Sequence, residues 1–148
     1  MCLDQTKLEC LNYNKAHPVQ HAIFENNDSY YLESDADAQI IINLGFTCPI
    51  KLHHLIIRAF NDKSKPSIVK LFVNTKPLGF SECENDEATQ EIVLKESDFK
   101  GEIPLKFVKF QAVKTLTIFF AENDGDDKTK ITKLGLFGNS EKETDVRK

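Results

Sequence analysis

Four histidines occur as two close pairs, and closely spaced histidines are common zinc ligands. His17 and His21 are spaced i, i+4, so a helix would bring their rings to one face. Pro18 lies between them, and no third ligand is nearby in the sequence. His53 and His54 are adjacent, and adjacent residues of a strand point to opposite faces. We therefore predict no metal site at either pair.

An acidic loop, Glu122–Asp127, carries the oxygen ligands that calcium prefers. An EF-hand also needs a glutamate at the twelfth position of its loop, where this chain has Leu134 or Gly135. This excludes an EF-hand. A looser calcium site between loops stays open as an alternative, but we favour a solvated turn in which asparagine, aspartate and glycine have their usual turn roles.

No motif in the sequence predicts an enzyme. There is neither a nucleophile with a recognisable base nor a glycine-rich phosphate loop. Asp35 and Asp37 form a carboxylate pair, but their flanking alanines and turn composition favour a structural role. Cys48 lies beside Pro49, and nothing near it in the sequence would activate its thiol. We predict a non-catalytic protein without cofactors.

The cysteines and the N-terminus bear on the compartment. Cys2, Cys10, Cys48 and Cys83 are too far apart for a redox pair or a zinc knuckle. The first residues, MCLDQTKLEC, lack the apolar core of a signal peptide, and no window approaches the ~18 consecutive apolar residues of a membrane span. We therefore predict a cytoplasmic or nuclear protein with reduced thiols and no membrane partner.

Size and charge indicate one globular domain. The 148 residues are 41% hydrophobic and 28% charged, which suffices for one core without covalent staples. The formal net charge is -4, whereas binding to nucleic acid draws most of its free energy from cationic contacts to phosphates. Nucleic acid is therefore not an expected partner. Separately, we expect the protein to be a monomer.

The apolar pattern is organised around residues 103–121, IPLKFVKFQAVKTLTIFFA. Because this stretch is apolar on nearly both parities, we predict two neighbouring strands in the middle of a sheet that is covered on both faces. We predict that Phe107, Phe110, Ile118 and Phe120 include several fully buried side chains. No window has the apolar spacing of a long helix.

Six further segments have the composition of strands: 29–33, 39–46, 50–60, 67–74, 89–94 and 130–137. A change of phase at His53-His54 indicates either a β-bulge or burial of both faces. About eight short strands predict an all-β jelly-roll β-sandwich, which we place at residues 3–138. Residues 139–148 contain only Val146 as a sizeable apolar residue, so we predict a flexible charged tail.

Charge is distributed unevenly along the chain. Residues 49–80 contain six lysines and arginines against Asp62 alone, and residues 81–98 contain seven acidic residues against Lys95. Such polarity can steer association with a partner protein. The alternative is that these charges form solvated faces on opposite edges of the sandwich.

Several segments, taken together and in order, resemble one family. They are Cys10-Leu11-Asn12, Leu32–Asp35, Pro49–Leu52, Lys70–Asn74, Thr89–Glu91, Pro104–Gln111, Leu116–Phe120, Asn123, Gly125, Thr129, Ile131 and Leu134–Gly138. The strongest is PLKFVKFQ at Pro104–Gln111. The chain thereby resembles the PITH domain, whose name stands for proteasome-interacting thioredoxin domain. Ala112 and Lys128 depart from the usual pattern of the family, but both lie in turns.

The resemblance implies a galactose-binding-like jelly roll and a non-catalytic module that docks on the 26S proteasome regulatory particle. It also implies either a stand-alone member or the C-terminal half of a thioredoxin-like protein, since the chain has no Cys-Gly-Pro-Cys segment. The charged loop and the tail are the candidate partner-binding segments, through Asp124, Asp126, Asp127, Lys128, Glu141, Glu143, Arg147 and Lys148. The alternative for the tail is a solvated end with no role.

Two other functions stay open. The first is a jelly roll that binds a small ligand or carbohydrate with its end loops, although the chain has no tryptophan and only three tyrosines to stack on a sugar. The second is a redox accessory, which would require a thiol of depressed pKa.

Overall fold

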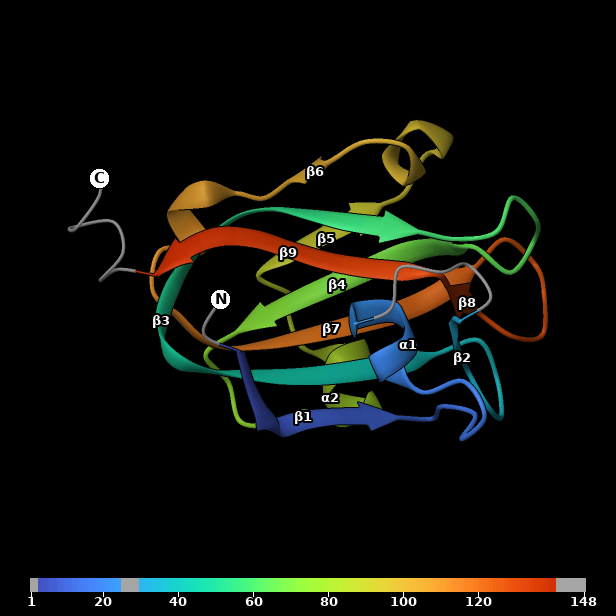
Figure 1. The fold of residues 1–148 in the computed structure, drawn as a ribbon, viewed down its shortest axis with the longest axis horizontal. Helices are drawn as coiled ribbons and strands as arrows, with labels where there is room; N and C mark the ends of the chain where they lie inside the picture. Colours follow the sequence, from blue (N-terminus) through green and yellow to red (C-terminus); the bar gives the residue numbers. More distant parts are fainter. Residues whose placement is uncertain (1–2, 25–29, 141–148) are drawn as a thin grey trace.

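One long strand, β3 (Ile40–Arg58), organises the computed structural model, which describes residues 3–24 and 30–140. The other strands are β1 (Leu3–Leu11), β2 (Leu32–Glu33), β4 (Pro66–Val73), β5 (Gln90–Val93), β6 (Ile103–Pro104), β7 (Val113–Asn123), β8 (Lys130–Ile131) and β9 (Lys133–Ser140). The helical elements of these residues are α1 (Val19–Phe24), α2 (Phe80–Asn85) and the 3-10 turns η1 (Glu96–Phe99) and η2 (Phe107–Lys109) (Figure 1).

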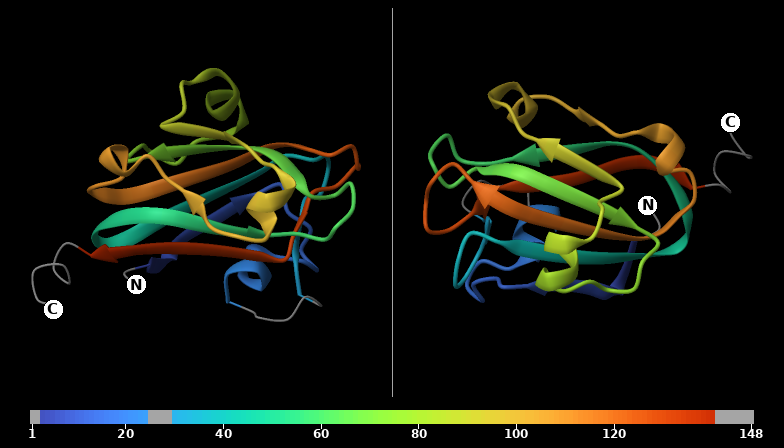
Figure 2. Two further views of the ribbon diagram at one scale, coloured as in Figure 1. Left: turned by 90° about the horizontal axis from the view of Figure 1, so that it is seen from above. Right: turned by 180° about the vertical axis from the view of Figure 1, so that it is seen from behind.

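β3 belongs to both layers of a sandwich because it changes hydrogen-bonding partners along its length. Its first half pairs with β1 and β7, from Ile40 opposite Phe120 to Gly45 opposite Thr115. Its second half pairs with β9 on one edge and β6 on the other. One layer therefore has the order β1-β3-β7-β4-β5 and the other β6-β3-β9 (Figures 1 and 2). This arrangement confirms the predicted jelly-roll sandwich.

The sequence predicted two strands in place of β3, and that prediction was wrong. The backbone stays extended through Thr47–Pro49, while the register with β7 shifts between Gly45 and Ile50. Pro49 has no N–H group to give to a ladder. It therefore lies where β3 leaves one sheet and enters the other.

The core lies between the two layers. β3, β4 and β7 send alternate residues into it: Ile40, Ile42, Leu44, Val69, Leu71, Leu116, Ile118 and Phe120. α1 adds Val19 and Ala22, and it packs beside β9 and β2. Phe110, Ile118 and Phe120 are fully buried, as predicted.

β7 is covered on its outer face as well, as its sequence predicted. Phe119 joins Ile41, Phe72 and Cys83 in a second buried cluster that α2 covers. Phe80 of α2 meets the Phe119 ring edge-on, with centroids 6.2 Å apart. The cover is thus a helix of six residues, too short to show a helical period in the sequence.

The first half of the central stretch does not form the predicted core strand. Only Ile103–Pro104 pairs as β6, and residues 107–109 form the turn η2. The proline of β6 cannot donate to a ladder, and Lys109 N instead donates to the Lys106 carbonyl at 2.8 Å. Phe107 is 45% exposed, so it is the one of the four candidate core residues that is not buried.

A β-bulge turns both His53 and His54 to the outside of β3. The register with β9 shifts between Leu52 and His54, and Leu52 and Leu55 are both fully buried. Two residues therefore fit between inward-facing leucines, and neither histidine is buried. The predicted bulge is confirmed, whereas the prediction that the two histidines face opposite sides was wrong.

The chain approaches itself closely at the bulge. Gly138 of β9 lies opposite Leu52, and a Cβ atom on Gly138 would overlap the carbonyl group of Lys51. Glycine is therefore required here for close approach of two backbones. The bulge and this glycine form one structural unit.

β9 extends through Ser140, two residues beyond the predicted end of the domain at 138. Asn139 pairs with Lys51, and Ser140 pairs with Ile50. The backbone of these two residues belongs to the sheet and not to a tail. Residues 141–148, the remainder of the predicted tail, lie outside the described residues.

The basic and acidic runs meet on neighbouring strands. Lys70 of β4 lies directly opposite Glu91 of β5. At this pair the two runs lie side by side, so they are not wholly separated on opposite edges of the sandwich.

The cysteines differ in their state. Cys10 and Cys83 are free, in agreement with the predicted reduced thiols. Cys48 is disulfide-bonded, which contradicts that prediction.

No helix in the described part of the chain is long and apolar enough to cross a membrane.

Replacing Phe120 with alanine should lower the free energy of unfolding by about 3–5 kcal/mol, because the ring is fully buried between the layers. Phe107→Ala is the matched control, and it should cost much less because that ring is half exposed. Urea denaturation of both variants measures the difference. Equal losses would show that Phe107 contributes to the core.

Gly138→Ala should destabilise the fold by about 3 kcal/mol, since a backbone must move to admit the new methyl group. Gly101→Ala is the control, because a Cβ there would meet only the Ser97 carbonyl oxygen at an ordinary 3.8 Å. Thermal melting compares the two variants. A Gly138→Ala protein as stable as Gly101→Ala would contradict the close approach at the bulge.

Candidate functional site

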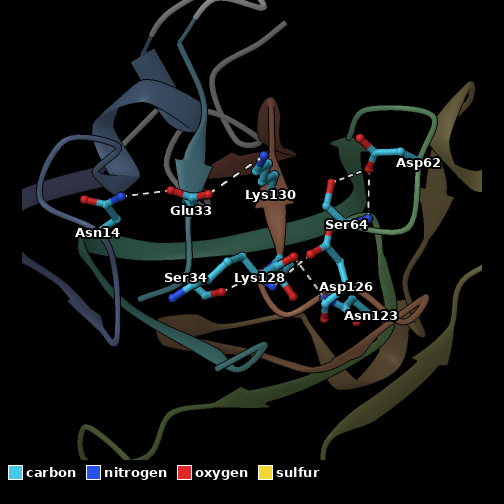
Figure 3. Close-up of polar contacts among 10 residues, drawn as sticks. Asn14, Glu33, Ser34, Asp62, Ser64, Asn123, Asp126, Lys128 and Lys130 are labelled. Carbon is cyan, nitrogen blue, oxygen red and sulfur yellow. Dashed lines mark hydrogen bonds and ion pairs between the residues drawn. The ribbon is translucent and has the colours of Figure 1, made fainter. Parts of the chain in front are cut away.

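The loop between β7 and β8 contains four of the predicted partner-binding residues, and Asn123 shapes it. Asn123 Nδ2 donates to the carbonyl groups of Asp126 and Lys128, each at 3.0 Å. Asn123 Oδ1 accepts from Gly125 N at 3.0 Å. Gly125 has a φ of +123°, a conformation that other residues rarely adopt. One side chain therefore holds the loop backbone at three points, of which Figure 3 shows those at Asp126 and Lys128.

A second loop, residues 59–65 between β3 and β4, is hydrogen-bonded to the first. Asp124 N and Asp126 N donate to the carbonyl groups of Lys65 and Lys63, at 3.2 and 3.3 Å. Lys65 Nζ also lies 3.5 Å from Asp124 Oδ2. The Asp124 carboxylate is thus already engaged within the chain.

Asp62 is the organising side chain of the second loop. Its Oδ1 accepts from Ser64 Oγ at 2.5 Å and from Ser64 N at 2.8 Å (Figure 3). These two hydrogen bonds, with help from the nearby Lys130 and Lys65, lower the pKa of Asp62 below its ordinary value of 3.8. Ser64 O accepts from Lys130 N at 3.0 Å, which joins the second loop to β8.

A third segment, which follows β2, is locked to the same end by buried polar groups. Ser34 N donates to Thr129 O at 2.9 Å, and Thr129 N donates to Ser34 Oγ at 2.8 Å. Thr129 Oγ1 donates to Ala38 O at 2.6 Å. Asp37 Oδ1 accepts from Gln39 N at 3.0 Å, a turn role. Three loops are thereby fixed to one another.

Aromatic rings gather beside these loops. Tyr31 stacks on His17, with centroids 4.0 Å apart, and meets Phe60 edge-on at 5.2 Å. Lys130 Nζ lies 5.6 Å from the centroid of the Tyr31 ring and 3.9 Å from Glu33 Oε2. The end of the sandwich formed by residues 34–39, 59–65 and 123–129, which we call the loop end, therefore combines fixed charges with a packed aromatic cluster.

Known proteins are similar in sequence to this chain along most of its length. Residues 1–148 match the family model described as PITH domain. The chain belongs to the PITH domain family. Thioredoxin-like protein 1 of Schizosaccharomyces pombe is 39% identical to this PITH domain over 144 residues, which are 93% of this chain and 49% of the relative. A PITH domain-containing protein of Drosophila pseudoobscura is 37% identical over 143 residues, 92% of this chain and 66% of the relative.

The PITH domain thus spans between about half and two thirds of the length of these relatives, 49% and 66%. Among solved structures it is similar to a family 32 carbohydrate-binding module of Clostridium perfringens NanJ in complex with galactose. The TM-score is 0.65 at 8% identity, over 87% of this chain and 90% of that one. At this identity the likeness shows the fold alone, a galactose-binding-like jelly roll.

Four of the predicted partner-binding residues, Asp124, Asp126, Asp127 and Lys128, lie together in the loop between β7 and β8 of the PITH domain. Asp126 and Asp127 are exposed in the loop, and Lys128 is half-buried. β9 ends at the opposite end of the sandwich from this loop (Figures 1 and 2). The other four, Glu141, Glu143, Arg147 and Lys148, lie outside the described residues.

The histidines and the acidic loop do not gather into a metal site in the described part of the chain. Within residues 3–24 and 30–140, no group of three or more His, Cys, Asp and Glu side chains is placed to hold a metal ion. The rings of His17 and His21 are 6.2 Å apart and pack on Tyr31 and Tyr30 instead. The loop end therefore offers charges and hydrogen-bonding groups on a fixed backbone.

Sequence reasoning missed Asp62 and Ser64 and the central role of Asn123. A local signal was available, because Asp62 and Asn123 each accept from the backbone N–H two residues ahead, as in Asx turns. The contact of Ser34 with Thr129 has no such signal, since the two residues are 95 positions apart.

Asn123→Ala should lower the free energy of unfolding by about 2 kcal/mol, because three backbone groups of the loop lose their partner. Asp127→Ala, in the same loop and exposed, is the matched control and should change stability by less than about 0.5 kcal/mol. Urea midpoints measure both. An Asn123→Ala protein as stable as the control would mean that the loop keeps its shape without this side chain.

Proposed function

We propose that this PITH domain is a non-catalytic protein-binding module that docks on the 26S proteasome regulatory particle. The observation that carries the proposal is the match of residues 1–148 to the PITH family, whose name refers to interaction with the proteasome. The module acts as a monomer in the cytoplasm or the nucleus.

The rigidity of the surface supports a binding role. The loop end is cross-linked by hydrogen bonds between three segments, from Ser34 to Thr129 and from Ser64 to Lys130. A surface that is ordered before binding loses less conformational entropy when a partner docks. The exposed carboxylates Asp126 and Asp127 can steer a basic partner toward this end.

The two free cysteines, Cys10 and Cys83, do not have the properties of redox-active thiols. Burial raises the pKa of Cys10 to about 12 and the pKa of Cys83 to about 11. A thiol with a raised pKa is almost entirely protonated at neutral pH, and the thiolate is the reactive form. The depressed pKa that a redox role requires is absent at both of these cysteines.

Affinity capture tests the proposal. The immobilised chain is incubated with purified 26S proteasome at low and at physiological salt, and retained subunits are identified by mass spectrometry. We expect regulatory-particle subunits to be retained above the level of an unrelated β-sandwich. Failure to retain them even at low salt would overturn the proposal.

The same capture tests the charged loop. Reversal of both charges, Asp126→Lys with Asp127→Lys, should reduce retention severalfold at low salt and less at high salt, because exposed charges act over a Debye length of about 10 Å at 0.1 M. Reversal of Asp86 and Glu87, two exposed carboxylates that follow α2, is the control.

Carbohydrate binding is the second candidate. Tyr30, at the loop end beside His21, is 43% exposed, and the fold is that of carbohydrate-binding modules. Binding on a glycan array that Tyr30→Ala abolishes would favour this function over proteasome docking.

A further inference from the structure

Two aromatic stacks on the outside of the β6-β3-β9 layer join into one strip. The His53 ring stacks on Phe107, with centroids 5.2 Å apart, and the His54 ring stacks on Phe137 at 4.8 Å. The bulge turns both histidines outward, so the two stacks are adjacent. With Val108, these residues form what we call the ring strip: His53, His54, Phe107, Val108 and Phe137.

The ring strip is unusually exposed for its composition. Phe107 is 45% exposed, Val108 82% and Phe137 40%, and these are three of the five large apolar side chains that are exposed among the described residues. Single exposed apolar residues are ordinary on protein surfaces, whereas several gathered on one site indicate an interaction surface.

The framework holds the ring strip in its exposed position. Leu105 and Phe110, on either side of η2, are buried in the core. Leu105 N donates to His53 O at 3.0 Å, and Gln111 Nε2 donates to Phe107 O at 2.8 Å. Phe107 and Val108 are thus displayed by a turn that is anchored at both ends, and a partner would find them already in place.

The charges around the ring strip are mostly positive. Lys106 and Lys109 are exposed on the same turn as Phe107, and Lys51 precedes the bulge. The nearby carboxylate of Glu102 is engaged, since its Oε2 lies 3.3 Å from His54 Nε2. In a chain of net charge -4, this local excess of cations favours an acidic partner.

We propose that the ring strip docks a partner-protein segment in which a large apolar side chain is flanked by acidic residues. The apolar side chain packs against Phe107, Val108 and Phe137, and the acidic residues face Lys106 and Lys109. A second copy of this chain is a poor match, because two-fold pairing would bring together two patches with the same excess of positive charge. This inference rests on the proposed function, because it takes the proteasome regulatory particle as the partner.

The test compares matched surface variants in capture of purified 26S proteasome. Phe107→Ser with Val108→Ser should reduce retention at least tenfold, whereas Val93→Ser, 66% exposed on the edge strand β5, should leave it unchanged. Lys106→Glu with Lys109→Glu should also reduce retention, and the exposed pair Lys95→Glu with Lys100→Glu should not. Thermal melting confirms that each variant folds.

The outcomes separate this inference from the proposed function. If the wild-type chain retains the proteasome and the variant Phe107→Ser with Val108→Ser retains it equally, the ring strip is overturned and the proposed function stands. If the wild-type chain retains none, the proposed function fails.

A second experiment then tests the ring strip by itself. A benzophenone amino acid is placed at position 108 and photo-crosslinked in cell extract, with position 93 as the control. Crosslinked peptides rich in Asp and Glu around an apolar residue support the ring strip. Crosslinks to a second copy, or none above control, overturn it.

Discussion

β3 hydrogen-bonds in both layers of the sandwich, so neither sheet is complete without it. Residues Ile40 to Gly45 stand in the middle of one layer, and Leu52 to Ile57 stand in the middle of the other. The core fills the space that this crossing encloses. Because both layers share one strand, we expect them to unfold in a single transition. The crossing at Pro49 also fixes the positions of the two ends of the molecule.

The two ends of the sandwich are built by different forces. At the loop end, buried hydrogen bonds such as those of Ser34 and Thr129 hold three segments together, and the exposed groups are charged. At the other end, the bulge opposite Gly138 spreads rings over the outer surface. Charges chiefly affect the rate and orientation of association, whereas buried apolar anchors chiefly set its lifetime. The ends therefore have different capacities for recognition.

The sequence predicted the elements whose local pattern agrees with their surroundings. β7 is apolar on both parities and is covered on both faces, and the phase change at His53-His54 is a bulge. Residues 103–110 have the composition of a strand, but Pro104 and contacts distant in the chain, such as Lys106 N with Gln90 Oε1 at 2.8 Å, turn them outward. The loop end was predicted only as a charged turn, since its cross-links join residues that are far apart in sequence.

The described chain begins and ends at the same end of the sandwich, near the bulge and away from the charged loop (Figures 1 and 2). β9, the last described strand, borders the ring strip through Phe137, so a domain attached after residue 148 would be tethered to that side of the molecule. A short flexible linker would hold such a neighbour at an effective concentration on the order of millimolar. Even a weak contact between the two would then compete with a partner in solution. Attachment through β9 would allow an added domain to mask this surface, while the charged loop stays open.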